Sequence, residues 1–430
     1  MRHRLTAAVF SGVLLISGCG QSAAVHVNSS HVSGASYRVY LEAGFNGGSQ
    51  PGITVVNSAG GTVERHLPLG TPAPDWSRLY VVVKGTTNGT LKAIQPSSGR
   101  TLAEIQIPGG FLLPDLTGLG PTAGLSPNGR WLALVRQLFD LHGTTTSVLL
   151  GESSLTQPFR QVDFTGDFSF DALSNDGRSL YLIQKLRDAN HYQVRLYDIA
   201  GRALAPAAVV DKREPNEPMN GVRGDSVAAQ AGNTAYTVYL RDKGPFIHAL
   251  PLAQPFAFCV DLPTKLGRNG LEEQSRWSLA LSPDESRVYA VNPSLGLVSV
   301  MSTKGNVPTI LKTASLPANQ TSWRLLPVMD AEAKGPGMGG TALSADGRTL
   351  FAVGMTSLLA IDTQSLAART ISVNGSYIDS LHMSSDGAWL FAARAGDQGK
   401  LWQINPMTGA MVGEIPTTDN PWAVLWAEPA

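Results

Sequence analysis

The chain has 430 residues, with 33 basic and 33 acidic side chains and therefore a formal net charge of zero. This balance argues against the basic surface that nucleic-acid binding requires, so we expect no nucleic-acid partner. The sequence contains 45 glycines and 27 prolines without low-complexity segments, which indicates many turns.

The first eighteen residues have the pattern of an export signal. MRHR supplies positive charge ahead of an apolar run, Leu5 to Ile16, that is too short to span a bilayer as a helix. The run ends in Ile16-Ser17-Gly18-Cys19, which resembles the lipobox of bacterial lipoproteins. The resemblance implies a signal peptide over residues 1–18, lipid attachment at Cys19, and a protein exported and anchored to the bacterial membrane. The alternative is an ordinary secretory signal with a chance cysteine.

Residues 19–35 are rich in Ser, Ala, Gly and Asn without periodicity, and we expect a flexible tether there. Residues 36–430 are predicted to form a single domain. The second of the two cysteines is Cys259, so a lipidated Cys19 leaves no partner for an intramolecular disulfide. Cys259 lies in the apolar run PFAFCVDL, which favours a buried, inert thiol over a nucleophile.

A decapeptide recurs along this domain as a polar turn followed by a run of β-branched or aromatic residues. Asp or Asn can bond its own backbone within such a turn, and Gly tolerates the left-handed geometry. The copies are APDWSRLYVV from Ala73, SPNGRWLALV from Ser126, SNDGRSLYLI from Ser174, SPDESRVYAV from Ser282, SADGRTLFAV from Ser344, SSDGAWLFAA from Ser384, and a worn copy, QAGNTAYTVY, from Gln230.

Most copies are followed by a second pattern, an apolar strand, a small polar turn and another apolar strand, as in LKAIQPSSGRTLAEIQI. Each unit therefore contains four strands, here called A to D, with the decapeptide turn joining A to B. Four-stranded units that repeat without helical periodicity between them are typical of the blades of a β-propeller. The predicted fold class is accordingly all-β.

The two ends of the sequence complete one blade between them. The C-terminal NPWAVLWAEPA matches an A strand, and YRVYLEAG near the start of the domain matches a B strand. Closing the ring in this way leaves no open sheet edge. The count is eight blades, with seven as the alternative if the worn unit at Gln230 distorts it. The repeats resemble the YVTN-type propellers of bacterial surface proteins, relatives of the tryptophan–aspartate repeat proteins. That group includes ligand-binding scaffolds and lactonase-like enzymes.

Strand direction predicts that the long connections share one face. The A-to-B and C-to-D turns are short, whereas the insertions fall in the D-to-A and B-to-C connections, which are expected on the opposite face. Elaboration of one face of a rigid scaffold is where binding sites commonly arise, although long loops can also simply cover the channel mouth. The insertions are 108–122, 211–224, 263–275 and 313–339 between blades, and Arg136–Thr144 and Gln184–His191 between strands B and C.

Polar and aromatic residues at the start of strand A lie next to this face and to the central channel. Arg and Trp together favour recognition of a carbohydrate, a carboxylate or a protein side chain. The alternative is structural: Trp277 fills a blade interface and Arg223 pairs with Asp225. The candidate ligand-binding residues are Arg223, Asp225, Arg276, Trp277, Trp323, Arg324, Tyr377 and Asp379.

Signatures of catalysis are missing from the sequence. The histidines show no paired metal-ligand spacing, there is no nucleophile elbow, and GPGMGG at Gly335 leads into a strand instead of a helix. We therefore predict no catalytic residues, no metal and no cofactor. The leading hypothesis is a monomeric, membrane-anchored binding or scaffold propeller for a protein or small molecule. The alternatives are a lactonase-like or other hydrolase using Asp171, Asp225 and Asp379, and an envelope assembly factor.

Overall fold

The named elements of the structure are all β-strands, as the repeats predict. The computed structural model describes residues 36–44, 52–114, 123–140, 143–186, 192–217, 219–241, 243–264, 274, 276–305, 307–317, 340–354, 357–373, 377–394, 399–417 and 421–430. The predicted signal peptide, Cys19 and the predicted tether lie outside these ranges. The described residues contain no helix that is long and apolar enough to cross a membrane.

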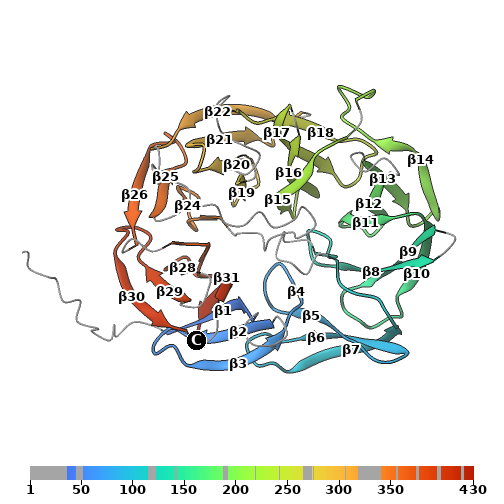
Figure 1. The fold of residues 1–430 in the computed structure, drawn as a ribbon, viewed down its shortest axis with the longest axis horizontal. Coiled ribbons are helices and arrows are strands. Elements are labelled where there is room, and N and C mark those ends of the chain that lie inside the picture. The colour runs from blue at the N-terminus through green and yellow to red at the C-terminus, as the bar shows by residue number, and fades with distance from the viewer. Residues whose placement is uncertain are drawn as a thin grey trace, which may run out of the picture. The chain divides into compact units, whose positions relative to one another are not determined.

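The strands form eight antiparallel sheets arranged in a ring, the blades of a propeller (Figure 1). Blades 1 and 2, from the inner to the outer strand, are β31 (Pro421–Pro429), β1 (Tyr37–Ala43), β2 (Gly52–Asn57), β3 (Val63–Pro68); and β4 (Thr71–Pro72), β5 (Leu79–Val83), β6 (Asn88–Ile94), β7 (Thr101–Pro108). Blades 3 and 4 are β8 (Trp131–Asp140), β9 (Gly143–Glu152), β10 (Arg160–Thr165); and β11 (Phe168–Leu173), β12 (Ser179–Lys185), β13 (Tyr192–Asp198), β14 (Ala203–Val209).

The second half of the chain continues the same order. Blades 5 and 6 are β15 (Val222–Ala229), β16 (Thr234–Arg241), β17 (Gly244–Pro251), β18 (Phe258–Asp261); and β19 (Ser278–Leu281), β20 (Arg287–Asn292), β21 (Leu297–Ser302), β22 (Thr309–Ser315). Blades 7 and 8 are β23 (Thr341–Leu343), β24 (Thr349–Gly354), β25 (Ser357–Asp362), β26 (Ala368–Ser372); and β27 (Ser380–Met383), β28 (Leu390–Arg394), β29 (Lys400–Ile404), β30 (Met411–Pro416).

The predicted ring closure is confirmed. The C-terminal strand β31 pairs with β1 over its whole length, from Tyr37 opposite Pro429 to Ala43 opposite Pro421. The Tyr40 hydroxyl donates a hydrogen bond of 2.7 Å to the Glu428 carboxylate. The worn repeat at Gln230 forms the β15–β16 hairpin of a complete blade. The count is therefore eight, and the seven-blade alternative is wrong.

Blade 3 departs from the four-stranded pattern. Its inner strand is reduced to two isolated bridges, Leu112 with Val135 and Leu125 with Leu132. Its β8 and β9 are ten residues each, the longest of the strands. Residues Arg136–Thr144 were predicted to be an inserted loop. They extend this β-hairpin instead, because β8 and β9 stay paired as far as Asp140 opposite Gly143.

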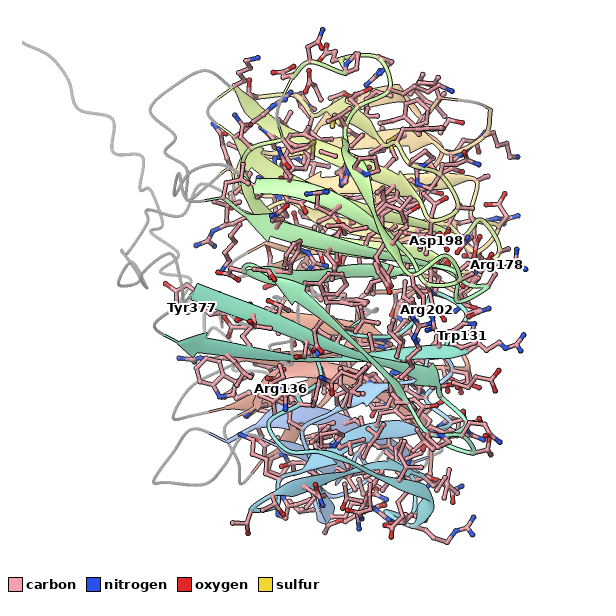
Figure 2. The ribbon with its side chains drawn as sticks, turned by 90° about the vertical axis from the view of Figure 1, so that its right-hand side faces the viewer. Trp131, Arg136, Arg178, Asp198, Arg202 and Tyr377 are labelled. Carbon is pink, nitrogen blue, oxygen red and sulfur yellow. The ribbon has the colours of Figure 1, made fainter. Side chains whose placement is uncertain are left out.

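The two ends of the blades are distinct surfaces. We call the end with the A-to-B and C-to-D turns the turn face, and the end with the B-to-C and D-to-A connections the loop face. Figure 2 shows the ring edge-on, with Tyr377 and Arg136 toward the loop face and Arg178, Asp198 and Arg202 toward the turn face. The strand ends that the long connections join thus share one face, as the strand order predicts, whereas residues 115–122, 187–191, 265–273 and 318–339 of these connections lie outside the described ranges.

The turns of the decapeptide have the expected structure. In blade 7, the Ser344 hydroxyl donates a hydrogen bond of 2.7 Å to the Asp346 carboxylate, and Gly347 has φ of +69°. The Asp346 carboxylate in turn accepts from the Arg348 backbone N–H at 3.0 Å. The Asp side chain and the left-handed residue together close the turn that delivers the chain from strand A to strand B.

Candidate functional site

The turn-face carboxylates are occupied within their own turns. In four blades the turn serine donates to the carboxylate two residues later at 2.6–2.7 Å, and these hydrogen bonds hold the pKa of the aspartates below the ordinary value. The pKa of Asp284 falls to about 2 for this reason. These carboxylates are engaged in closing their turns. The four aspartates are Asp176, Asp284, Asp346 and Asp386.

Six of the predicted ligand-binding residues lie in the described part of the chain, at the loop-face ends of three inner strands. Arg223 and Asp225 are on β15 of blade 5. Arg276 and Trp277 immediately precede β19 of blade 6, and Tyr377 and Asp379 precede β27 of blade 8. Blades 5 and 6 are neighbours, whereas blade 7 separates blade 6 from blade 8. Trp323 and Arg324 lie outside the described residues.

Asp225 joins blade 5 to blade 6. Its carboxylate accepts a hydrogen bond of 2.7 Å from the backbone N–H of Leu279, on the inner strand of blade 6, and one of 2.9 Å from its own neighbour Ser226. Burial raises the pKa of Asp225 to about 6, against the opposing effect of the nearby Arg223 guanidinium. A comparable contact closes the ring, where the backbone N–H of Val424 donates to the Ser380 hydroxyl at 2.7 Å.

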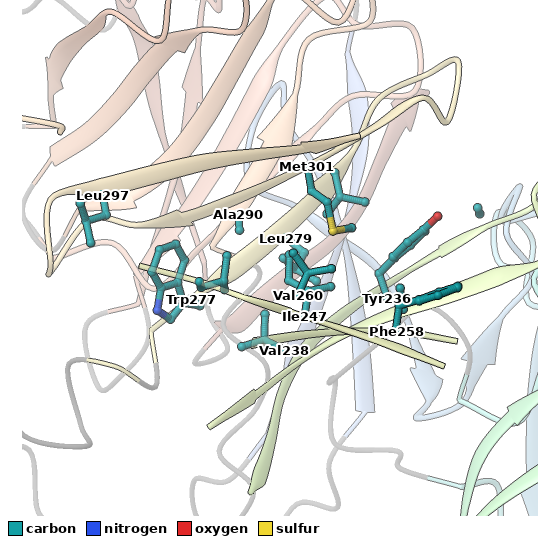
Figure 3. Close-up of a cluster of buried hydrophobic side chains, with 14 of the residues drawn as sticks. Tyr236, Val238, Ile247, Phe258, Val260, Trp277, Leu279, Ala290, Leu297 and Met301 are labelled. Atoms are coloured by element: carbon teal, nitrogen blue, oxygen red, sulfur yellow. The ribbon is translucent and has the colours of Figure 1, made fainter. Parts of the chain in front are cut away.

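Trp277 and Tyr377 occupy opposite environments. Trp277 is 2% exposed and packs with Leu279, Val238 and Ile247 in the apolar cluster between blades 5 and 6 (Figure 3). Its indole therefore fills the blade interface, the structural alternative for this residue. Tyr377 is 47% exposed at the loop face and is accessible to a ligand or a partner (Figure 2).

Exposed apolar side chains are more numerous at the loop face than elsewhere on the described residues. Among the described residues, eight large hydrophobic side chains are exposed, and five of them stand at the loop-face ends of strands or in the adjoining connections. Of the other three, Leu102 and Leu311 are on outer strands and Met407 is in a turn of blade 8. The five loop-face residues are Val83, Leu112, Leu138, Val222 and Tyr377.

The interface between blades 4 and 5 contains a polar layer that the sequence did not reveal. Along β16, Thr237 lies between Ala235 and Tyr239, and along β17, His248 lies between Leu250 and Phe246. The flanking residues belong to two separate apolar clusters, so Thr237 and His248 divide the interface.

The layer is buried. His248 is 1% exposed and its Nε2 has no hydrogen-bond partner among the described residues. Burial lowers the pKa of His248 to about 4, so the imidazole is neutral at pH 7. Its ring meets that of Tyr239 edge-on at 5.7 Å. Tyr239 is itself stacked between Tyr192 at 5.7 Å and Phe246 at 5.6 Å.

A small open cleft lies beside this layer and shares Phe246 and Cys259 with its surroundings. The segment that connects β14 to β15 folds over it, held by Asp211, whose carboxylate accepts from the Cys259 backbone N–H at 2.7 Å and from the Arg213 guanidinium at 2.9 Å. The cleft is lined by Asp211, Glu214, Glu217, Met219, Asn220, Arg241, Phe246 and Cys259.

Cys259 lines this cleft as a protonated thiol. Burial raises the pKa of Cys259 to about 12, which is consistent with the inert thiol that its apolar surroundings predict. The Sγ atom lies 3.8 Å from the Met219 Sδ atom. Within the described ranges, no three His, Cys, Asp or Glu side chains are grouped to hold a metal ion.

Sequence reasoning also missed Glu42, a buried acid on β1. Glu42 is 5% exposed, and burial raises its pKa to about 7. The signal that could have found Glu42 and His248 is the same: each is a titratable residue inside a strand whose neighbours are apolar, YRVYLEA and GPFIHALP.

Comparison with known proteins supports the fold and leaves the family open. No family model matches the chain, and no curated protein matches it. Two structures of AztD from Citrobacter koseri superpose with TM-scores of 0.54 and 0.51, at 10% and 9% identity, each covering 92% of this chain and 98% of AztD. This chain and AztD therefore share the arrangement of their strands. A periplasmic gluconolactonase from Pseudomonas aeruginosa is 19% identical over 81% of this chain and 99% of its own, with a TM-score of 0.42. The superposition with AztD shows a common propeller fold, and at 10% and 9% identity it shows no common activity.

Proposed function

We propose that the protein is an exported binding propeller, anchored to the bacterial membrane through a lipidated Cys19, that presents its loop face to a protein or small-molecule partner. The observation that carries the proposal is that five of the eight exposed large apolar side chains of the described residues lie at that face, distributed over several blades. An uneven distribution of exposed apolar side chains between two faces favours the richer face as the interaction surface. A propeller of this kind acts as a monomeric scaffold, without catalysis and without nucleic acid.

The contrast between the two faces supports the choice of surface. Turn-face carboxylates are engaged by their own turn serines and backbone N–H groups, which leaves them little capacity to bind a ligand. At the loop face, Tyr377 and Leu138 are 47% and 49% exposed. The apparent export signal and residues 19–35 would place this domain outside the cytoplasm on a short tether.

Site-specific photocrosslinking in intact cells tests the binding surface. A photoreactive residue at Leu138 or Tyr377 should capture a discrete partner, whereas one at Met407, which is 87% exposed at the turn face, should not. Leu138→Asp should abolish capture from Tyr377, while Met407→Asp leaves it unchanged. Equal capture from both faces would contradict the proposal.

Cell fractionation tests the anchor separately. Cys19→Ala should release the protein from the membrane fraction with an unchanged melting temperature, because residue 19 precedes the propeller strands by a tether-length segment. A variant that stays firmly membrane-bound would exclude the lipid as the main attachment.

A hydrolase, lactonase-like or otherwise, is the second candidate function. The observation that favours it is the raised pKa of Asp225, about 6, since a carboxyl group with such a pKa suits general acid–base chemistry. Both oxygens of Asp225 already accept backbone hydrogen bonds, however, and Asp171 and Asp379 lie on blades 4 and 8. Hydrolysis of a panel of lactones and esters that disappears in Asp225→Asn would support this function over simple binding.

A further inference from the structure

The sulfur atoms of Cys259 and Met219 form a pair in the cleft between blade 5 and the segment that connects β14 to β15. Sγ and Sδ are 3.8 Å apart, and both residues line the open cleft. Bonds from sulfur to a first-row d¹⁰ ion are about 2.3 Å long, so one ion could contact both atoms at an angle of about 110°. The pair therefore has the separation that two sulfur ligands of a single ion require.

A buried imidazole, that of His248, lies on the strand next to Cys259. His248 is directly opposite Cys259 in the β17–β18 ladder, so both side chains leave the sheet on the same face. Directly opposed residues have Cβ atoms roughly 4.5–5.5 Å apart, within reach of a shared ion. His248 is 1% exposed and its Nε2 has no hydrogen-bond partner within the described ranges. A buried ring nitrogen without a partner is costly unless it serves a ligand.

We propose that Cys259, Met219 and His248 form a binding site for Cu(I). Thiolate, thioether and neutral imidazole are the ligands that this soft ion prefers, and a thioether is a poor ligand for Zn(II), Mg(II) or Ca(II). The Asp211 carboxylate in the same cleft is held by the Arg213 guanidinium and the Cys259 backbone N–H, so it is engaged within the protein. This inference goes beyond the proposed function and does not depend on it.

Binding involves no change of oxidation state. Copper enters as Cu(I), the Cys259 S–H bond breaks, a Cu–S bond forms, and the thiol proton leaves to solvent. Met219 and His248 donate lone pairs without losing a proton. The aromatic stack of Tyr192, Tyr239 and Phe246 borders the layer and limits the access of water, which favours a low-coordinate soft ion.

Anaerobic titration with Cu(I) against bathocuproine disulfonate tests the site in the full chain. Cys19→Ser serves as the parent, so that Cys259 is the sole thiol. We expect the parent to bind one equivalent of Cu(I) in competition with the chelator, and Cys259→Ala to bind none. Met219→Leu and His248→Gln should each reduce the affinity for Cu(I) at least about tenfold. Met301→Leu, a buried methionine of the blade 5–6 interface, is the matched control and should bind as the parent does. Unchanged affinity in Met219→Leu, or binding retained by Cys259→Ala, would overturn the proposal.

A second measurement needs no ligand variant and so does not depend on how the variants fold. X-ray absorption of the parent loaded with one equivalent of Cu(I) should count two sulfur neighbours of the copper. A copper with one sulfur neighbour or none would show that the two sulfur atoms merely pack together.

Discussion

Blade 5 meets its two neighbours in different ways. Toward blade 6 it contributes Tyr236, Val238 and Ile247 to one continuous cluster of fifteen buried residues (Figure 3). Toward blade 4 the same strands place Thr237, Tyr239 and His248, and the apolar surface divides into clusters of seven and three buried residues. The alternation of side chains along β16 and β17 separates the two sets.

The difference indicates where the propeller can accommodate a ligand. A continuous apolar interface is stabilised by every methylene it removes from water, and a polar group there would lower stability. The blade 4–5 interface gives up part of that stabilisation and retains buried polar atoms beside an open cleft. Residues that lower the stability of the fold, with no packing interaction that compensates for the loss, are typical of functional sites.

Trp277→Ala should produce the largest effect. Removing the indole from the blade 5–6 cluster leaves a cavity between two rigid sheets, and we expect a loss of about 3–5 kcal/mol in the free energy of unfolding. Urea denaturation measures it, with Tyr377→Ala as a matched aromatic control at the exposed loop face. A loss below about 1 kcal/mol would mean that the indole is not a packing residue.

Glu42→Gln tests a single acid in an otherwise apolar blade 1–2 interface. The folded protein keeps the Glu42 proton up to about pH 7, whereas the unfolded chain releases it near pH 4.5, so wild-type stability falls as pH rises between these values. The variant should match wild type at pH 4 and exceed it by about 3 kcal/mol at pH 8. Glu104→Gln, on exposed outer strand β7, is the matched control for the loss of one carboxylate. A stability difference that is constant from pH 4 to pH 8 would contradict the burial of this carboxyl group.

His248→Leu should have a small effect on the metal-free protein. Leucine has a volume similar to that of histidine, and the substitution removes two buried ring nitrogens. The free energy of unfolding at pH 7 should therefore fall by no more than about 1 kcal/mol, or should increase. Thermal denaturation of the metal-free protein measures it, and Thr237→Val provides a second removal of a polar group from the same layer. A large loss in the metal-free protein would show that the imidazole stabilises the fold by itself.

Leu138→Asp should have the smallest effect. Its side chain is 49% exposed near the end of the β8–β9 hairpin, and substitutions at exposed sites usually change stability by less than about 0.5 kcal/mol. Differential scanning calorimetry checks this value. A marked destabilisation would mean that Leu138 packs within the propeller instead of facing a partner.

Sequence alone determined the architecture, because it is local and repeated. The decapeptide turns, the alternating strands and the two half-blades at the ends each follow from the residues within one unit, and β31 pairs with β1 as the matching segments predict. The sequence did not predict how far the β8–β9 hairpin extends. Arg136–Thr144 continues as a hairpin because its ladder depends on two strands together, not on the propensity of either.

The site was decided by tertiary structure. Trp277 and Tyr377 are both aromatic residues ahead of an inner strand, yet one is 2% and the other 47% exposed, because Trp277 packs in the blade 5–6 cluster whereas Tyr377 lies three residues before β27. Met219 and Cys259 are 40 residues apart in the sequence and lie in contact only because a connecting segment folds back onto β18. Repeats specify what each blade is, whereas burial and ligand geometry depend on which faces of two blades meet, and no single repeat encodes that.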